Sequence, residues 1–109
     1  MMKEILATAD RPTAIFAASD AIAFGAMRAI SEAGLNVPGD ISVIGFNDVE
    51  ACKYTTPALT SIHAPAYDMG AHGANLVYVS SNLQIRTPLK VKIPCKLIKR
   101  ESCAEIKSD

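Results

Sequence analysis

Two pairs of polar residues stand where apolar runs end, and their side chains are the best suited to ligand chemistry in this sequence. Ser19 and Asp20 follow the run AIFAA, and Asn47 and Asp48 follow the run ISVIGF. A carboxylate accepts hydrogen bonds from hydroxyl groups, whereas an asparagine amide both donates and accepts them. Such groups suit a neutral, polyhydroxylated ligand. Because Ser, Asp and Asn are also the preferred residues at helix N-termini, a purely capping role stays open for either pair.

The cysteines and histidines form no recognisable metal or redox motif. Cys52, Cys95 and Cys103 have no CxxC spacing, and His63 and His72 complete no zinc pattern. We therefore expect reduced thiols and no metal ion or other cofactor.

No catalytic motif accompanies the carboxylates. The sequence contains no GxSxG, P-loop or GxGxxG pattern. A flavodoxin-like or hydrolase-like enzyme that used Asp20 or Asp48 as acid or base would need a nucleophile or a cofactor loop beside them. We therefore expect a binding protein rather than an enzyme.

Charge and hydropathy exclude two other classes. The 109 residues carry 11 Lys and Arg and 11 Asp and Glu, so the formal net charge is zero. A chain that gripped nucleic acid by its phosphates would need a basic excess. The N-terminus lacks the apolar core of a signal peptide, and no apolar run approaches the roughly 20 residues of a membrane span. These features favour a cytoplasmic protein of one domain.

The polar pairs need a parallel sheet to bring them together, and the flanking patterns predict one. Residues 14–18 and 41–46 read as buried strands, and residues 20–33 read as a helix with Gly34 as its C-cap. A strand, a helix and a strand of this length make a βαβ unit with parallel strands. Parallel strands end at the same edge of the sheet, where open α/β folds bind ligands.

The patterns elsewhere in the chain predict further helices and strands. We expect a helical end over residues 1–9, a strand over 59–64 and a helix from Pro65 to about Ser80. Residues 89–93 alternate between apolar residues and lysine, which predicts a half-exposed edge strand. Another strand could follow within residues 95–102. We interpret its basic cluster as a solvated face; the cluster comprises Lys96, Lys99 and Arg100.

The predicted helix over residues 20–33 is apolar on nearly every side at its start. One apolar stripe would suffice to cover a sheet, and after Asp20 no charged residue appears before Arg28. Something besides the sheet should therefore cover the first turns. A partner subunit and a neighbouring loop of the same chain both remain possible.

The chain resembles the C-terminal part of the ligand-sensing domain of LacI/GalR-type repressors. The segments RPTAIFAASD, GLNVPGDISVIGFND and PALTSIHAPAYDMG carry the resemblance, which extends from about Arg11 to Ser102. The segment HGANLVY is slightly more similar to repressors of galactose or β-galactoside genes than to other members of the family. The resemblance implies a partial periplasmic-binding-protein fold of α/β class, with parallel βαβ units. It assigns residues 1–62 to the C-terminal subdomain, 65–93 to elements of the N-terminal subdomain, and 95–103 to a returning strand.

The resemblance also implies functional residues and partners. Ser19 and Asn47 stand where the family often places effector contacts, Asp48 beside them is mainly structural, and Ala64 lies at a crossover that lines the cleft. The implied partners are a small sugar effector, a second copy of the chain, and operator DNA bound only through a domain absent from this chain. The implied dimer surface comprises Ala21, Ile22, Phe24, Gly25, Met27, Ala51 and Tyr54. A periplasmic sugar-binding protein of a transport system is the alternative, although the apolar helix argues against it.

Overall fold

The sheet of the computed structural model, which describes residues 1–106, has four strands in the order β1-β2-β3-β4. The first three strands are parallel and β4 runs antiparallel to β3. The predicted α/β class with parallel βαβ units is therefore confirmed. In chain order the elements are α1 (Met2–Leu6), β1 (Ala14–Phe16), α2 (Asp20–Glu32), β2 (Ser42–Phe46), the 3₁₀ helix η1 (Glu50–Lys53), β3 (Thr60–His63), α3 (Ala66–Asn82) and β4 (Lys96–Ile98).

Local sequence explains where α2 begins and ends. The Ser19 hydroxyl accepts a hydrogen bond from the backbone N–H of Ile22 at 3.3 Å, which satisfies one of the free donors of the first turn. After the helix, Gly34 has a φ of +75°, a left-handed conformation that glycine adopts without steric cost. The two residues therefore act as the caps that the sequence suggests.

The core lies between α2 and the sheet. Ala23 and Ile30 on α2 are fully buried, as are Val43 on β2 and Leu59 just before β3. These positions fall on one stripe of the helix, whose side chains repeat every 3.6 residues, and on the buried face of the sheet, whose side chains repeat every two residues. The two apolar surfaces pack against each other. Among the described residues, the hydrophobic core therefore lies within the first 59 residues.

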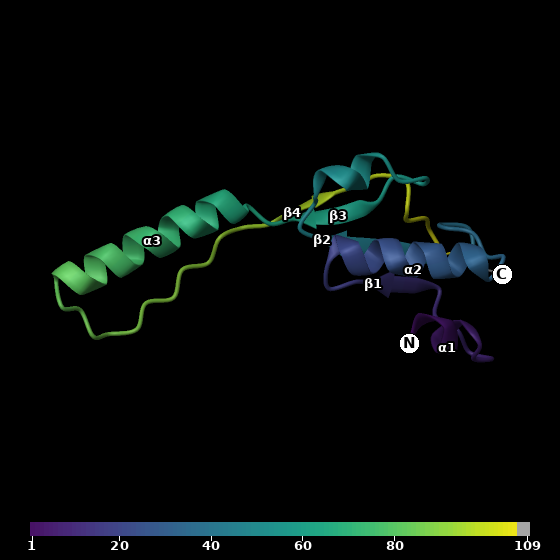
Figure 1. Ribbon diagram of the computed structural model, residues 1–109, viewed down its shortest axis with the longest axis horizontal. Coiled ribbons are helices and arrows are strands. Elements are labelled where there is room, and N and C mark those ends of the chain that lie inside the picture. The colour runs from purple at the N-terminus through teal and green to yellow at the C-terminus, as the bar shows by residue number, and fades with distance from the viewer. Residues whose placement is uncertain (107–109) are drawn as a thin grey trace.

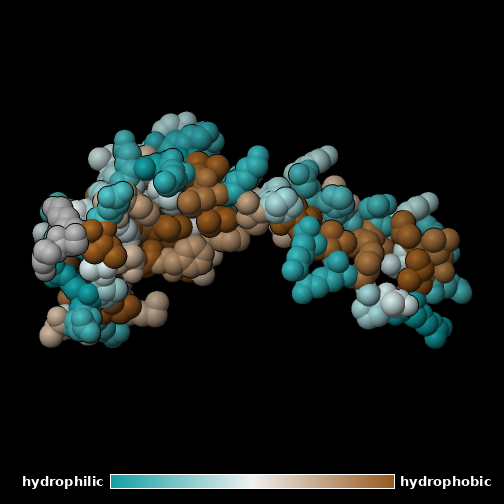
Figure 2. Space-filling view, turned by 180° about the vertical axis from the view of Figure 1, so that it is seen from behind, coloured by the Kyte–Doolittle hydropathy of each residue, from teal (hydrophilic) through white to brown (hydrophobic). Residues whose placement is uncertain are grey.

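The remainder of the chain projects away from this core. Figure 1 shows α3 and the segment after it extending to one side of the sheet. The dimensions are 59 × 27 × 26 Å and the radius of gyration is 18.6 Å, against roughly 13 Å for a compact domain of this length. No residue of α3 is buried. Its apolar side chains face solvent, as the hydrophobic surface in Figure 2 shows.

One sequence prediction about the C-terminal part of the chain differs from the structure, and another is confirmed. Residues 89–93 were expected to form an edge strand but have no regular structure. An alternating pattern becomes a strand only when a neighbouring backbone offers ladder hydrogen bonds, and residues 1–106 provide no such neighbour there. The strand expected within residues 95–102 is present: β4 covers Lys96–Ile98 and pairs with β3.

The first turns of α2 are covered on one side only. Ala23, Ala26 and Met27 are buried towards the sheet, whereas Ile22 remains 53% exposed on the other side. Apart from its chain neighbours and the backbone of its own helix, Gly25 has no atom within 4 Å of the position its Cβ would take. Among the described residues, no loop of the chain therefore covers this outer face of α2.

Candidate effector-binding site

Asp20 is the structural centre of the polar strand edge. Its side chain, 1% exposed, begins α2 and accepts two hydrogen bonds, from the Ser61 hydroxyl at 2.6 Å and from the backbone N–H of Val49 at 2.8 Å. Hydrogen bonds to an ionised acceptor are stronger than those between neutral groups. Asp20 therefore joins the start of α2 to β3 and to the loop after β2.

Gly45 makes room for this carboxylate. A Cβ at Gly45 would overlap the Oδ1 of Asp20 and would lie 3.0 Å from the Cδ2 of Leu59. Both neighbours are fixed by burial. The glycine in the middle of β2 is thus explained by the close approach of the Asp20 side chain.

Asn47 and Asp48 form a tight turn in which both residues have a positive φ, of 103° and 58°. Asn and Asp tolerate this region better than most residues. The N–H of Asn47 donates to the carbonyl of Ile62 at 2.9 Å, and the N–H of Asp48 donates to the Ser61 hydroxyl at 3.1 Å. Within residues 1–106 the side-chain amide of Asn47 is exposed and has no hydrogen-bond partner.

The Asp48 carboxylate is held by two basic residues. Its Oδ1 accepts a hydrogen bond from Nη2 of Arg100 at 2.7 Å, and its Oδ2 lies 3.2 Å from Nδ1 of His63. The prediction that Arg100 belongs to a solvated basic face is wrong, because its side chain is only 13% exposed and forms an ion pair. The Asp48 partner of His63, 15 residues away in sequence, follows no local spacing rule.

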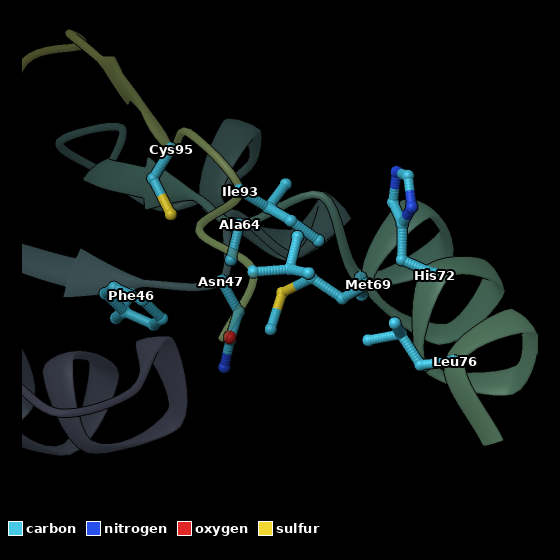
Figure 3. Close-up of a pocket in the computed structure, with 11 residues that line it drawn as sticks. Phe46, Asn47, Ala64, Met69, His72, Leu76, Ile93 and Cys95 are labelled. Atoms are coloured by element: carbon cyan, nitrogen blue, oxygen red, sulfur yellow. The ribbon is translucent and has the colours of Figure 1, made fainter. Parts of the chain in front are cut away.

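A cavity near the strand edge brings together two of the expected effector residues, Asn47 and Ala64. It encloses about 500 Å³ between β2, the crossover after β3, α3 and the segment leading to β4. Its lining comprises Phe46, Asn47, Ala64, Ala66, Met69, His72, Gly73, Leu76, Val91, Ile93 and Cys95. Figure 3 shows Asn47 between Phe46 on one side and Met69 on the other. Ser19 and Asp48 do not line the cavity; Ser19 caps α2, and Asp48 anchors the turn behind Asn47.

The cavity is mostly apolar on the side of α3. Met69 and Leu76 from the helix and Ile93 from the following segment form that wall, and the polar groups come from Asn47 and His72. A ligand bound here would therefore meet the Asn47 amide at the sheet edge and, opposite it, a largely apolar wall that also carries the His72 imidazole.

Cys52 and the residue types that commonly bind metals also occur outside this cavity. Burial, together with a hydrogen bond to Asp20, raises the pKa of the Cys52 thiol to about 11, so the thiol stays protonated at neutral pH. Across residues 1–106 there is no cluster of three or more His, Cys, Asp or Glu side chains that could hold a metal ion. The same part of the chain contains no helix long and apolar enough to cross a membrane.

The residues expected at a dimer surface occupy different environments. Ala21, Ile22 and Gly25 on α2 are exposed, and so are Ala51 and Tyr54 in and after η1. Phe24 is half-buried. Met27 packs in the core with 9% of its surface exposed, which leaves little of it for a partner.

Residues 1–103 match the family described as periplasmic binding protein-like domain. The chain belongs to this family. Over 104 residues it is 41% identical to the HTH-type transcriptional repressor PurR of Escherichia fergusonii, a match that covers 95% of this chain and 30% of that protein. The chain thus spans less than a third of this relative's length.

Solved structures of this periplasmic binding protein-like fold confirm the architecture and the resemblance to LacI-type regulators. A LacI family transcriptional regulator from Enterococcus faecalis with bound ribose is 38% identical, with a TM-score of 0.84, covering 97% of this chain and 39% of that one. The Lac repressor dimer bound to operator and the anti-inducer ONPF is 34% identical, also with a TM-score of 0.84, over 94% of this chain and 35% of that one.

Sequence reasoning missed two residues that shape this site. Ser61 reads as one more residue of a short strand, and Arg100 reads as one of three basic residues near the C-terminus. Their partners are 41 and 52 residues away in sequence, at Asp20 and Asp48. A local pattern contains no signal for either contact.

Proposed function

We propose that this chain senses a small carbohydrate for a LacI/GalR-type transcriptional repressor. The observation that carries the proposal is the unpaired side-chain amide of Asn47 on the wall of a 500 Å³ cavity at the carboxyl edge of parallel strands. An amide in this position can donate to one sugar hydroxyl and accept from another. Two similar LacI family transcriptional regulators, from Enterococcus faecium and Enterococcus faecalis, were solved with bound ribose, which supports a sugar ligand.

The proposed effector residues have different tasks. Asn47 makes the polar contact, and the small side chain of Ala64 leaves space for the ligand at the crossover. Asp48 sets the position of the Asn47 turn, and Ser19 fixes the start of α2 next to the same edge. The sugar is a pentose, galactose or a galactoside in this proposal, and the chain performs no catalysis.

Dimerisation is the second part of the proposal. The outer face of α2, with Ile22 53% exposed and Tyr54 76% exposed in the segment after η1, offers apolar surface that a second copy would cover. Apolar surface gathered on one face commonly marks a protein–protein interface. Operator DNA would be bound through residues outside this chain, in agreement with its net charge of zero. Such a repressor would act in the cytoplasm.

The domain assignment explains how the signal would travel. In this proposal residues 1–62 and the returning strand belong to one subdomain, and α3 belongs to the other, with the effector between them. A ligand that contacts Asn47 on one side and the α3 side of the cavity on the other would favour one relative orientation. Only a difference in affinity between the two orientations can shift the balance.

A titration followed by NMR would test the ligand class. D-ribose, D-galactose, lactose and hypoxanthine would each be added at millimolar concentration while the amide signals of the ¹⁵N-labelled chain are recorded. We expect at least one of the sugars to move the signals of Asn47 and Ala64, and Asn47→Ala to abolish the shift. Asn75→Ala on the exposed face of α3 is the matched control. Shifts caused only by hypoxanthine, or by none of the four compounds, would refute a carbohydrate effector.

A further inference from the structure

We propose that Arg100 is a positioning residue that holds Asn47 in its ligand-facing conformation. This inference rests on the proposed function, because it concerns the same effector site. Arg100 does not line the cavity itself. It acts through Asp48, the residue that follows Asn47 in the turn.

Arg100 makes three hydrogen bonds to two different parts of the sheet edge. Its backbone N–H donates to Oγ1 of Thr60 at 2.9 Å, its Nη1 donates to the carbonyl of Leu59 at 2.8 Å, and its Nη2 donates to Oδ1 of Asp48 at 2.7 Å. The guanidinium is planar and rigid, so the last two contacts share one geometry. The Asp48 carboxylate is therefore fixed relative to the beginning of β3.

The turn needs such an anchor because its backbone is unusual. Both Asn47 and Asp48 have a positive φ, and residues held in sparsely populated backbone regions persist only where surrounding contacts determine them. The backbone of the turn is tied to β3 through Ile62 and Ser61. The Arg100 contact is the one that restrains the Asp48 side chain from the direction of β4.

The same contact connects the turn to both chain crossovers. His63, the other partner of Asp48, ends β3 directly before the chain leaves for α3. It pairs in register with Lys96, the first residue of the strand that returns, and Arg100 lies just after that strand. A change in the path of either crossover would therefore reach Asn47 through the Asp48 carboxylate.

Three variants of the full chain test this role. Arg100→Met removes the charge and both side-chain donors but keeps much of the side chain's length. Asp48→Asn keeps the shape of the turn residue and leaves the Arg100 contact with Leu59 in place. This variant keeps the test valid if Arg100→Met fails to fold. Arg100→Lys keeps the positive charge but lacks the planar guanidinium with its rigidly spaced donors. The matched control is Lys99→Met, which removes the neighbouring exposed charge.

The first measurement needs no ligand. A positive φ brings the amide proton close to the α-proton of the same residue, so Asn47 and Asp48 should give strong intraresidue NOEs in the parent chain and in Lys99→Met. We expect Arg100→Met and Asp48→Asn to weaken both NOEs, and Arg100→Lys to recover them in part. Unchanged NOEs in a folded Arg100→Met or Asp48→Asn variant would overturn the proposal.

The second measurement is the dissociation constant for D-ribose, or for whichever sugar of the panel shifts the Asn47 signal. Loss of the charge-assisted hydrogen bond should weaken binding about tenfold or more, and the double variant with both substitutions should lose no more than either single one. Additive losses would show that the two residues act separately and would overturn the shared contact. If the parent chain binds no sugar, the proposed function fails, while the NOE comparison still decides the positioning role.

Discussion

Replacing Ser61 by alanine is the sharpest test of how the sheet edge is held together. The Ser61 side chain is fully buried on β3, and its hydroxyl connects two residues of the site. It donates to the Asp20 carboxylate at 2.6 Å and accepts from the N–H of Asp48 at 3.1 Å. The substitution removes one oxygen atom, and no bulk is added.

The expected loss of stability follows from these two contacts. A hydrogen bond to a charged group contributes about 1.5–3 kcal/mol, and a buried donor left without a partner costs about 1–3 kcal/mol. Because the Asp48 turn can relax towards water, we expect a total near the lower half of the sum, about 2–4 kcal/mol. A domain of this length has a free energy of unfolding of roughly 5–15 kcal/mol, so the loss is a large share of it.

Urea unfolding followed by circular dichroism measures this loss. With a slope of about 1.5 kcal/mol per molar urea, the midpoint should fall by roughly 1.3–2.7 M. Ser31→Ala, at an exposed position of α2, is the control and should stay within about 0.5 kcal/mol of the parent chain. Equal midpoints for the two alanine variants would refute the reasoning. A double-mutant cycle with Asp20→Asn should give a clear coupling energy, because the two side chains share a hydrogen bond.

Two further predictions concern the packing and the thiols. Gly45→Ala should destabilise the chain by about 1–3 kcal/mol, since the new methyl group meets a fixed carboxylate, and the urea midpoint would show it; an unchanged midpoint would mean that Asp20 can move aside. With the thiol reagent DTNB at pH 8, exposed Cys95 should react at once, whereas Cys52, whose pKa is raised to about 11, should react only after unfolding. Peptide mapping identifies the modified residue, and rapid labelling of Cys52 in the folded chain would contradict its burial.

Local patterns in the sequence predicted the elements that carry the site. The apolar runs before Ser19 and Asn47 predicted β1 and β2, and the period of residues 20–33 predicted α2. Those signals are local because one face of a strand carries every second residue, and one face of a helix carries residues three or four apart. The meeting of the two polar pairs at one edge then followed from the parallel topology.

Local patterns did not predict which polar residue caps a helix or anchors the backbone and which one faces the cavity. The sequence left capping and ligand contact open for Ser19, and the structure shows it accepting from the N–H of Ile22. Asn47 and Asp48 both looked polar and available. Only the fold shows that Asp48 is held by Arg100 while the Asn47 amide stays free on the cavity wall.

By itself, then, the sequence determined the class of fold, the limits of α2 through Ser19 and Gly34, and the edge where a ligand would bind. The tertiary structure decided which side chains meet there. Arg100 reaches Asp48 across 52 residues because β4 lies beside β3, and residues 89–93 remain irregular because no strand is present to pair with them. The physical reason is the same in both cases: a pairing between distant segments depends on which backbones come together, and a local alternation of residues does not specify its partner.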